Sequence, residues 1–141
     1  MNYSKFTSNQ GWLTFYYPSN FINTEEDKGT YLFYTEQTGS FRITPLKLEG
    51  KSDFDADSYL KKMSKEYSAE ILKNSYNNYV YYVSYSNDDS DDLTIYNWIF
   101  AVNKKIIYCS YTIDSISTNE PEIDLERKEI FKIIENLNIT S

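Results

Sequence analysis

The strongest constraint on this sequence is a pair of apolar runs within residues 93–114, LTIYNWIFAVNKKIIYCSYTID. The polar triplet at residues 103–105 separates the two runs, and this pattern predicts a β-hairpin. With a two- or four-residue turn, paired residue numbers sum to an odd value. One face of the hairpin then carries Tyr96, Trp98, Phe100, Ile107, Cys109, Tyr111 and Ile113. The other face carries Ile95, Ile99, Ala101, Ile106 and Tyr108. Because both faces are apolar, we expect the hairpin to lie in mid-sheet with both faces covered.

Further strands are expected where aromatic and β-branched residues cluster between turn residues. They cover residues 11–17, 30–36, 40–48, 69–73 and 78–86. Pro45 predicts that the strand over 40–48 lies at an edge or contains a bulge, since proline cannot donate a ladder hydrogen bond. Residues 1–9 are polar, and we expect them to form a loose lead-in.

Two segments have the period of an amphipathic helix. In residues 51–67, the apolar stripe consists of Ala56, Leu60, Met63 and Tyr67. The second segment begins near Asn119, and its stripe consists of Ile123, Ile130, Ile133, Ile134 and Leu137. The element order is β-β-β-α-β-β-β-β-α. It predicts an α+β fold in which two main helices pack on the faces of a mostly antiparallel sheet of about six to seven strands. We expect residues 1–141 to form a single domain.

Four stretches of the sequence are distinctive: residues 12–18 (WLTFYYP, with Phe21 after them), 39–43 (GSFRI), 103–108 (NKKIIY) and 130–134 (IFKII). Taken in order, they resemble the PsbP/DcrB-like fold, which a photosystem II extrinsic subunit shares with a Ran-binding release factor. The resemblance implies an antiparallel sheet between helices, and a binding role without catalysis. It also implies a bacterial domain of unknown function that acts as a small partner of other proteins, and some DcrB-like domains are chaperones of secreted effectors.

The charge balance narrows the choice of partner. The chain has 21 acidic and 14 basic residues, no His and a net charge of −7. A nucleic-acid binder must neutralise phosphates, so this charge has the wrong sign for one. An acidic surface suits a basic protein partner instead. The sequence shows no transmembrane stretch and no signal-peptide pattern, so we expect a cytoplasmic protein without a membrane partner.

Three groups of residues invite a chemical role, and in each case we prefer a structural one. Cys109 has no His to activate it and reads as a buried strand residue. The acidic group at residues 88–92 lacks the spacing of an EF-hand loop, and Asp53, Asp55 and Asp57 are interpreted as the start of a helix. Glu25, Glu26 and Asp27 lie in a charged turn with no apolar context to shift a pKa. We therefore expect no catalytic residue, no metal site and no cofactor.

The tyrosines supply the candidate site, because Tyr is enriched at protein interfaces. Tyr79, Tyr81 and Tyr85 share one face of the strand over residues 78–86. An acidic loop follows and would steer a basic partner. The predicted protein-binding residues are Tyr76, Tyr79, Tyr81, Tyr82, Tyr85, Asp88, Asp89, Asp91 and Asp92.

We interpret the chain as a non-catalytic protein-binding module. It would be a bacterial immunity protein that neutralises a toxin, or a chaperone-like partner of a secreted effector. An alternative is a carrier that holds a small apolar ligand between sheet and helix. A hydrolase built on carboxylates alone is the least favoured reading.

Overall fold

The computed structural model describes residues 2–26, 29–37, 39–50, 53–87 and 92–140. At its centre lies the predicted hairpin, formed by β8 (Asp92–Val102) and β9 (Lys105–Asp114). The register is the expected one, with Trp98 opposite Cys109. Asn103 makes the tight turn possible with a positive φ of 54°, a conformation that asparagine tolerates better than most residues.

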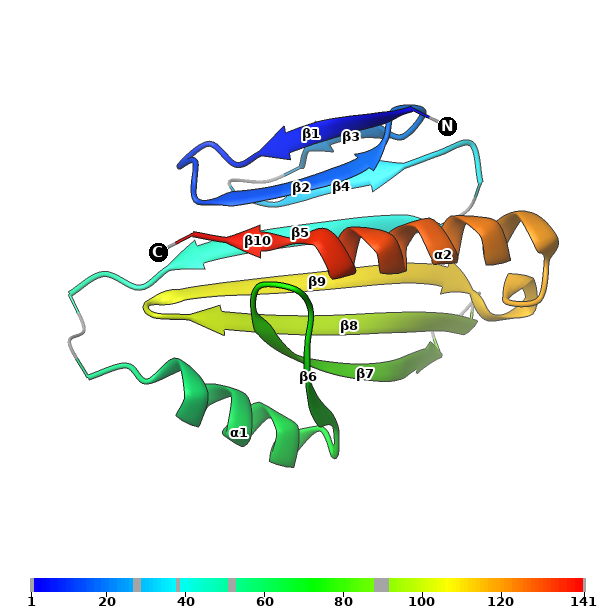
Figure 1. Cartoon of the computed structure of the whole chain (residues 1–141). Helices are drawn as coiled ribbons and strands as arrows, with labels where there is room; N and C mark the ends of the chain where they lie inside the picture. Colours follow the sequence, from blue (N-terminus) through cyan, green and yellow to red (C-terminus); the bar gives the residue numbers. More distant parts are fainter. Residues whose placement is uncertain (1, 27–28, 38, 51–52, 88–91, 141) are drawn as a thin grey trace.

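The hairpin is the middle of a seven-stranded antiparallel sheet in the order β3-β4-β5-β9-β8-β7-β6 (Figure 1). Its other strands are β3 (Ile22–Glu25), β4 (Tyr31–Tyr34), β5 (Ser40–Lys47), β6 (Glu70–Lys73) and β7 (Asn78–Asn87). With two main helices, this arrangement confirms the predicted α+β fold class and the order of its main elements.

A second, three-stranded sheet in the order β1-β2-β10 was not expected. Its strands are β1 (Tyr3–Thr7), β2 (Leu13–Pro18) and β10 (Asn138–Ile139). β1 corrects the loose lead-in expected for residues 1–9. Its polar residues pair with β2 along its whole length, and Phe6 stacks on Phe15 with ring centroids 4.9 Å apart. Pairing and one aromatic anchor therefore order a segment whose composition alone does not predict a strand.

The two helices cover opposite faces of the large sheet. α1 (Ala56–Glu66) buries Leu60 and Met63 against Val80, Ile99 and Ala101 near the hairpin turn. α2 (Pro121–Asn136) follows the short 3-10 helix η1 (Ser115–Ser117) and runs along the other face beside β2 (Figure 1). The hairpin is thus covered on both faces only near its turn, and Tyr108 on the α1 side is 37% exposed.

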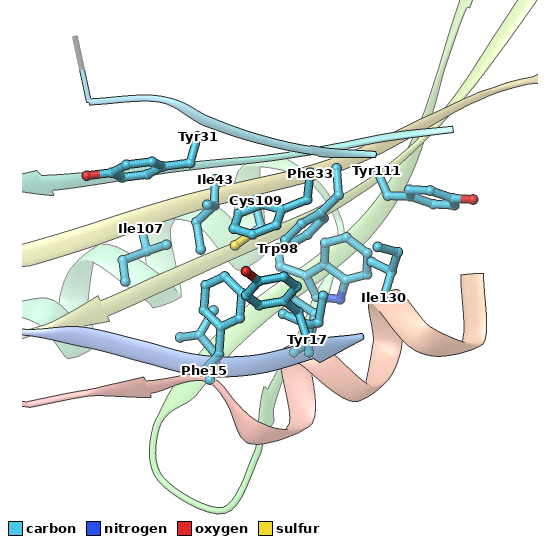
Figure 2. Packing of buried hydrophobic residues seen from close by; sticks show 14 of the residues in the cluster. Phe15, Tyr17, Tyr31, Phe33, Ile43, Trp98, Ile107, Cys109, Tyr111 and Ile130 are labelled. Atoms are coloured by element: carbon cyan, nitrogen blue, oxygen red, sulfur yellow. The ribbon is translucent and has the colours of Figure 1, made fainter. Parts of the chain in front are cut away.

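The main core lies between the large sheet, the small sheet and α2. Trp98, Tyr111 and Phe33 point into it from the large sheet, Phe15 comes from β2 and Ile130 from α2 (Figure 2). These side chains are almost fully buried. They fill the space between sheet and helix with edge-to-face aromatic contacts, such as that between Trp98 and Phe131 at 5.5 Å.

β5 is an inner strand of the sheet and not the edge strand expected, but Pro45 lies in a part of β5 that is paired on one side only. β5 pairs with β9 along its whole length, whereas its pairing with β4 ends at Ile43, opposite Tyr31. Pro45 is two residues past this last pair. The missing N–H therefore costs no ladder hydrogen bond on the β4 side.

Candidate protein-binding surface

β7 places Tyr79, Tyr81, Val83 and Tyr85 on one face of the sheet, as the alternation predicts. Their exposure rises along the strand, because α2 covers only its first half. Tyr79 is 6% exposed and Tyr85 is 77% exposed. Tyr81 lies between them, stacked on Trp98 and edge-on to Phe131 of α2. Tyr85 is therefore the one residue of this face whose ring lies largely in solvent.

Tyr76 and Tyr82 do not join Tyr85. Tyr82 points to the α1 face, where its ring stacks on Tyr67 with centroids 4.2 Å apart and planes 5° from parallel. Burial, together with a hydrogen bond to Tyr67, raises the pKa of Tyr82 to about 12. Tyr76 is exposed in the β6–β7 turn, at the opposite end of β7 from Tyr85. The predicted tyrosines are therefore distributed over two faces and both ends of the strand.

The acidic part of the predicted site is only partly described. Asp88, Asp89 and Asp91 lie outside the described residues. Asp92 is the first residue of β8, is exposed, and pairs with Asn87 at the end of β7. It therefore lies two residues along the ladder from the pair formed by Tyr85 and Thr94.

Beside Tyr85 the surface is hollowed on the α2 face, with a volume of about 640 Å³. The residues that line this hollow come from the large sheet, from the segment around η1 and from α2. Val83, Thr94 and Tyr96 belong to the sheet, Thr118 follows η1, and Arg127 comes from α2. Sequence reasoning assigned no site role to Arg127 or Thr118. The i, i+3 spacing of Asp124 and Arg127 signals an ion pair, but it does not show that Arg127 reaches β8.

Arg127 is held in a fixed position at this hollow. Its guanidinium donates to the carbonyl oxygen of Thr118 at 3.1 Å and to Oδ1 of Asp124 at 2.8 Å. It also lies 5.9 Å from the ring centre of Tyr96, a distance typical of a cation–π contact. Hydrogen bonds from Lys128, and then from Arg127, lower the pKa of the exposed Asp124 carboxyl. An Arg and an aromatic ring thus stand preorganised in an open hollow.

An exposed apolar side chain lies close to the same hollow. Ile116 in η1 is 93% exposed and follows Ser115, which lines the hollow. We call the hollow together with Tyr85 and Ile116 the Tyr85 surface. Tyr and Arg, which this surface combines, are among the residues enriched at the centre of protein interfaces.

The outer edge of β7 is paired over part of its length only. β6 pairs with residues 78–81 of β7. No described strand pairs with the outer side of residues 82–87. Val83 and Tyr85 belong both to this edge and to the hollow. The Tyr85 surface therefore borders an open strand edge.

The other candidate groups have structural roles in the described residues. Cys109 is 3% exposed, and burial raises the pKa of its thiol well above the usual value. Glu26 accepts two hydrogen bonds from Arg42, at 2.7 and 3.1 Å, and the first of these contacts lowers the pKa of Glu26. Glu25 accepts from the N–H of Gly29 at 3.2 Å. Asp27 lies outside the described residues.

Asp55 caps α1 by accepting from the N–H of Asp57 at 3.0 Å. Over the described parts of the chain, no three acidic, Cys or His side chains converge in an arrangement that could hold a metal ion. The same parts contain no helix with the length and apolar character needed to cross a bilayer.

Comparison with known proteins shows the fold and the family. A family model described as Domain of unknown function (DUF3805) matches residues 1–139. No curated protein matches the sequence. A crystal structure from Bacteroides thetaiotaomicron VPI-5482 is 25% identical with a TM-score of 0.79, and the match covers 100% of this chain and 50% of that chain. The present chain therefore spans about half the length of that protein.

Two further structures are more distant in sequence. LpqN, described as involved in cell envelope biogenesis of Mycobacterium tuberculosis, is 11% identical with a TM-score of 0.71, and the match covers 99% of this chain and 91% of LpqN. Cyanobacterial PsbP (CyanoP) from Synechocystis sp. PCC 6803 is 9% identical with a TM-score of 0.51, with 97% and 92% covered. These likenesses confirm the PsbP/DcrB-like fold that the sequence resembles.

Proposed function

This chain belongs to the family described as Domain of unknown function (DUF3805), and we propose that it is a non-catalytic protein-binding module whose partner docks on the Tyr85 surface. The observation that carries the proposal is the exposed ring of Tyr85, 77% accessible, beside a hollow that contains the fixed guanidinium of Arg127. Tyr and Arg provide much of the free energy at interface centres, because large, rigid or preorganised groups lose little entropy when they are buried.

The charge of the chain supports a basic partner. The net charge is −7. The sequence that follows β7 contains Asp88, Asp89, Asp91 and Asp92, and of these the described Asp92 is exposed at the start of β8. Acidic residues at a rim accelerate encounter with a basic protein, while the central aromatic and Arg groups determine how long the complex lasts. A toxin neutralised by an immunity protein, or a secreted effector escorted by a cytoplasmic bacterial chaperone, is a partner of this kind.

The packing gives less support to a small-ligand carrier. Such a carrier would need space between the large sheet and α2. Trp98, Tyr111 and Phe33 of the sheet and Ile130 of the helix fill that region (Figure 2). We therefore place binding on the outside of the fold.

A display library of genomic fragments from the source organism tests the proposal. Each fragment that binds the wild-type protein is measured again with Tyr85→Ala and with Tyr16→Ala. Tyr16 is 52% exposed on β2, so it is a matched control away from the Tyr85 surface. We expect Tyr85→Ala to weaken binding by about tenfold or more and Tyr16→Ala to leave it unchanged. Binders that are insensitive to Tyr85→Ala would contradict the proposal.

A further inference from the structure

No described strand pairs with the outer edge of β7 at residues 82–87, so another strand could pair there. β6 occupies the edge as far as the pair between Glu70 and Tyr81, and then the chain leads back to α1. Ser68, just before β6, adopts a positive φ of 51° at this bend. The inner side of β7 pairs with β8 as far as Asn87. Within the described parts of the chain, no other strand pairs with the N–H and C=O groups that alternate on the outer side.

This edge lacks the features that usually prevent pairing with other chains. Residues 82–87 read YVSYSN, with no charged residue and no proline. The edge strand β3 ends in Glu25, and the edge strand β6 carries Glu70 and Lys73 at its ends. Proteins commonly protect edge strands with charges or proline. Among these edges of the seven-stranded sheet, β7 is thus the one at which an added strand meets the fewest obstacles.

Hollows lie where the side chains of an added strand would project. The hollow of the Tyr85 surface, about 640 Å³, lies on the α2 side of the edge. A second hollow of about 360 Å³ lies in line with the end of β6 and is lined by Tyr67, Glu70, Tyr82 and Val83 among others. Successive side chains of a strand point to opposite faces. An added strand could therefore bond to the backbone of β7 while its side chains enter these hollows.

The charges at the two ends of the edge indicate the kind of strand. Glu66 and Glu70 are exposed at the end near β6, and Asp92 is exposed at the other end. The six edge residues between them are uncharged. A complementary segment therefore has basic residues near both ends and uncharged residues between them, with alternate side chains suited to the hollow lined by Tyr85 and Tyr96.

We propose that residues 82–87 of β7 bind an extended, basic-flanked segment of the partner protein as an added β-strand. This inference rests on the proposed function, and it specifies how the partner is held. Main-chain hydrogen bonds would supply affinity, and the hollows would select side chains. The Tyr85 surface would then recognise a sequence motif rather than a folded shape.

The test uses a displayed library of peptides of about nine residues, long enough for one strand. The protein is the full chain, and an enriched peptide is resynthesised with single backbone N-methyl groups at each position in turn. We expect the enriched peptides to be basic at their ends. We also expect N-methylation to reduce affinity by about tenfold at alternate positions only, because only every second N–H faces β7.

Protein variants provide the second readout. Val83→Pro and Ser84→Pro are compared because one of two neighbouring N–H groups points outward, and neither change removes the Tyr85 ring. The variant whose thermal melting shows an intact fold should abolish peptide binding. Ser4→Pro on the small-sheet strand β1, if it also melts as an intact fold, is the control that should leave binding unchanged.

The outcomes separate this inference from the proposed function. Peptides that tolerate N-methylation at every position but lose affinity with Tyr85→Ala would overturn strand addition and leave a protein-binding Tyr85 surface. Failure to enrich any peptide, or enrichment of peptides unaffected by either change, would overturn strand addition. A dimer of the chain that the fold-preserving proline variant abolishes would assign the edge to a second copy and would also overturn the inference.

Discussion

The hydroxyl group of Tyr111 donates a hydrogen bond to Oε1 of Glu126 at 2.6 Å inside the core. Glu126 is 6% exposed, and its other carboxylate oxygen accepts from the hydroxyl group of Thr35. One buried carboxylate on α2 thus joins the central strand β9 to the segment after β4. Burial first, and then the contact with Glu126, raises the pKa of Tyr111 far above the usual value, which keeps the phenol protonated as a donor.

Gly39 lies against Tyr111 and Glu126, and the space there admits no larger residue. A Cβ at this position would lie 2.7 Å from the ring and hydroxyl oxygen of Tyr111 and would also clash with Oε1 of Glu126. We expect Gly39→Ala to lower the free energy of unfolding by about 1–3 kcal/mol, the usual cost of overpacking. Urea unfolding measures the change. In a Glu126→Ala background the added cost should shrink, because the nearest atom is gone; equal costs in both backgrounds would refute this account.

Asn74 should be a second sensitive residue. Its amide nitrogen donates to the carbonyl oxygens of Ile134 and Leu137 at 2.7 and 2.9 Å, and its oxygen accepts from the N–H groups of Tyr76 and Asn77. Asn74→Ala removes this partner from two buried carbonyl groups and two part-buried N–H groups, and should cost about 2–3 kcal/mol of unfolding free energy. Asn78→Ala, at an exposed position of β7, is the control and should cost less than about 0.5 kcal/mol.

Cys109 should behave as a buried hydrophobic residue. It is opposite Trp98 in the hairpin, and burial raises the pKa of its thiol, so little reactive thiolate forms at neutral pH. A thiol reagent should label the native protein slowly and the urea-unfolded protein at once. Cys109→Ser should destabilise the fold by about 1–3 kcal/mol, because a hydroxyl group is buried there. Rapid labelling of the native protein would contradict this placement.

Alkaline pH should destabilise the protein partly through Tyr82. Its folded-state pKa is raised to about 12, whereas an unfolded Tyr titrates near 10. The contribution is fully present below pH ~10 and is lost as the pH rises through ~12, because the unfolded chain releases the proton first. Unfolding free energies measured across this window should fall less steeply for Tyr82→Phe than for wild type. An equal dependence of unfolding free energy on pH in wild type and Tyr82→Phe would assign the titration to another group. Tyr16→Phe, which alters an exposed ring on β2, serves as the control.

The acidic residues after β7 should act on association rather than on dissociation. Replacing Asp88, Asp89, Asp91 and Asp92 by Asn removes the charge that steers a basic partner. The association rate constant should fall by about tenfold at low salt, and its dependence on salt should flatten. The dissociation rate constant should change little. Surface binding kinetics at several salt concentrations measure both, and an unchanged association rate would exclude steering by this loop.

The sequence predicted those parts of the fold that apolar periodicity determines. The hairpin register follows from the alternation of Trp98, Phe100, Ile107 and Cys109, and α2 buries its predicted stripe, including Ile130. The strands β1, β3 and β10 were missed because they are short and largely polar. They form where neighbours offer a partner, as Leu13 of β2 does for Ile139. Local pattern carries no signal for pairing of this kind.

The candidate site, too, could be predicted from the sequence only in part. Alternation assigned Tyr79 and Tyr85 to one face, but it could not show that α2 covers the first and leaves the second in solvent. Arg127 reaches Tyr96 only because α2 crosses the sheet at that point. Burial gradients and contacts between distant elements depend on the tertiary arrangement. The Tyr85 surface could therefore be located only once the helix was placed.

The most direct test of the proposed function is the dissociation rate of a selected partner from matched tyrosine variants. Tyr85→Ala should raise the dissociation rate constant by about tenfold or more, because it removes a central aromatic contact. Tyr16→Ala, which removes an exposed ring of the same kind from β2, should leave it unchanged. Equal dissociation rates for wild type and Tyr85→Ala, or a larger effect from Tyr16→Ala, would contradict a binding surface at the end of β7.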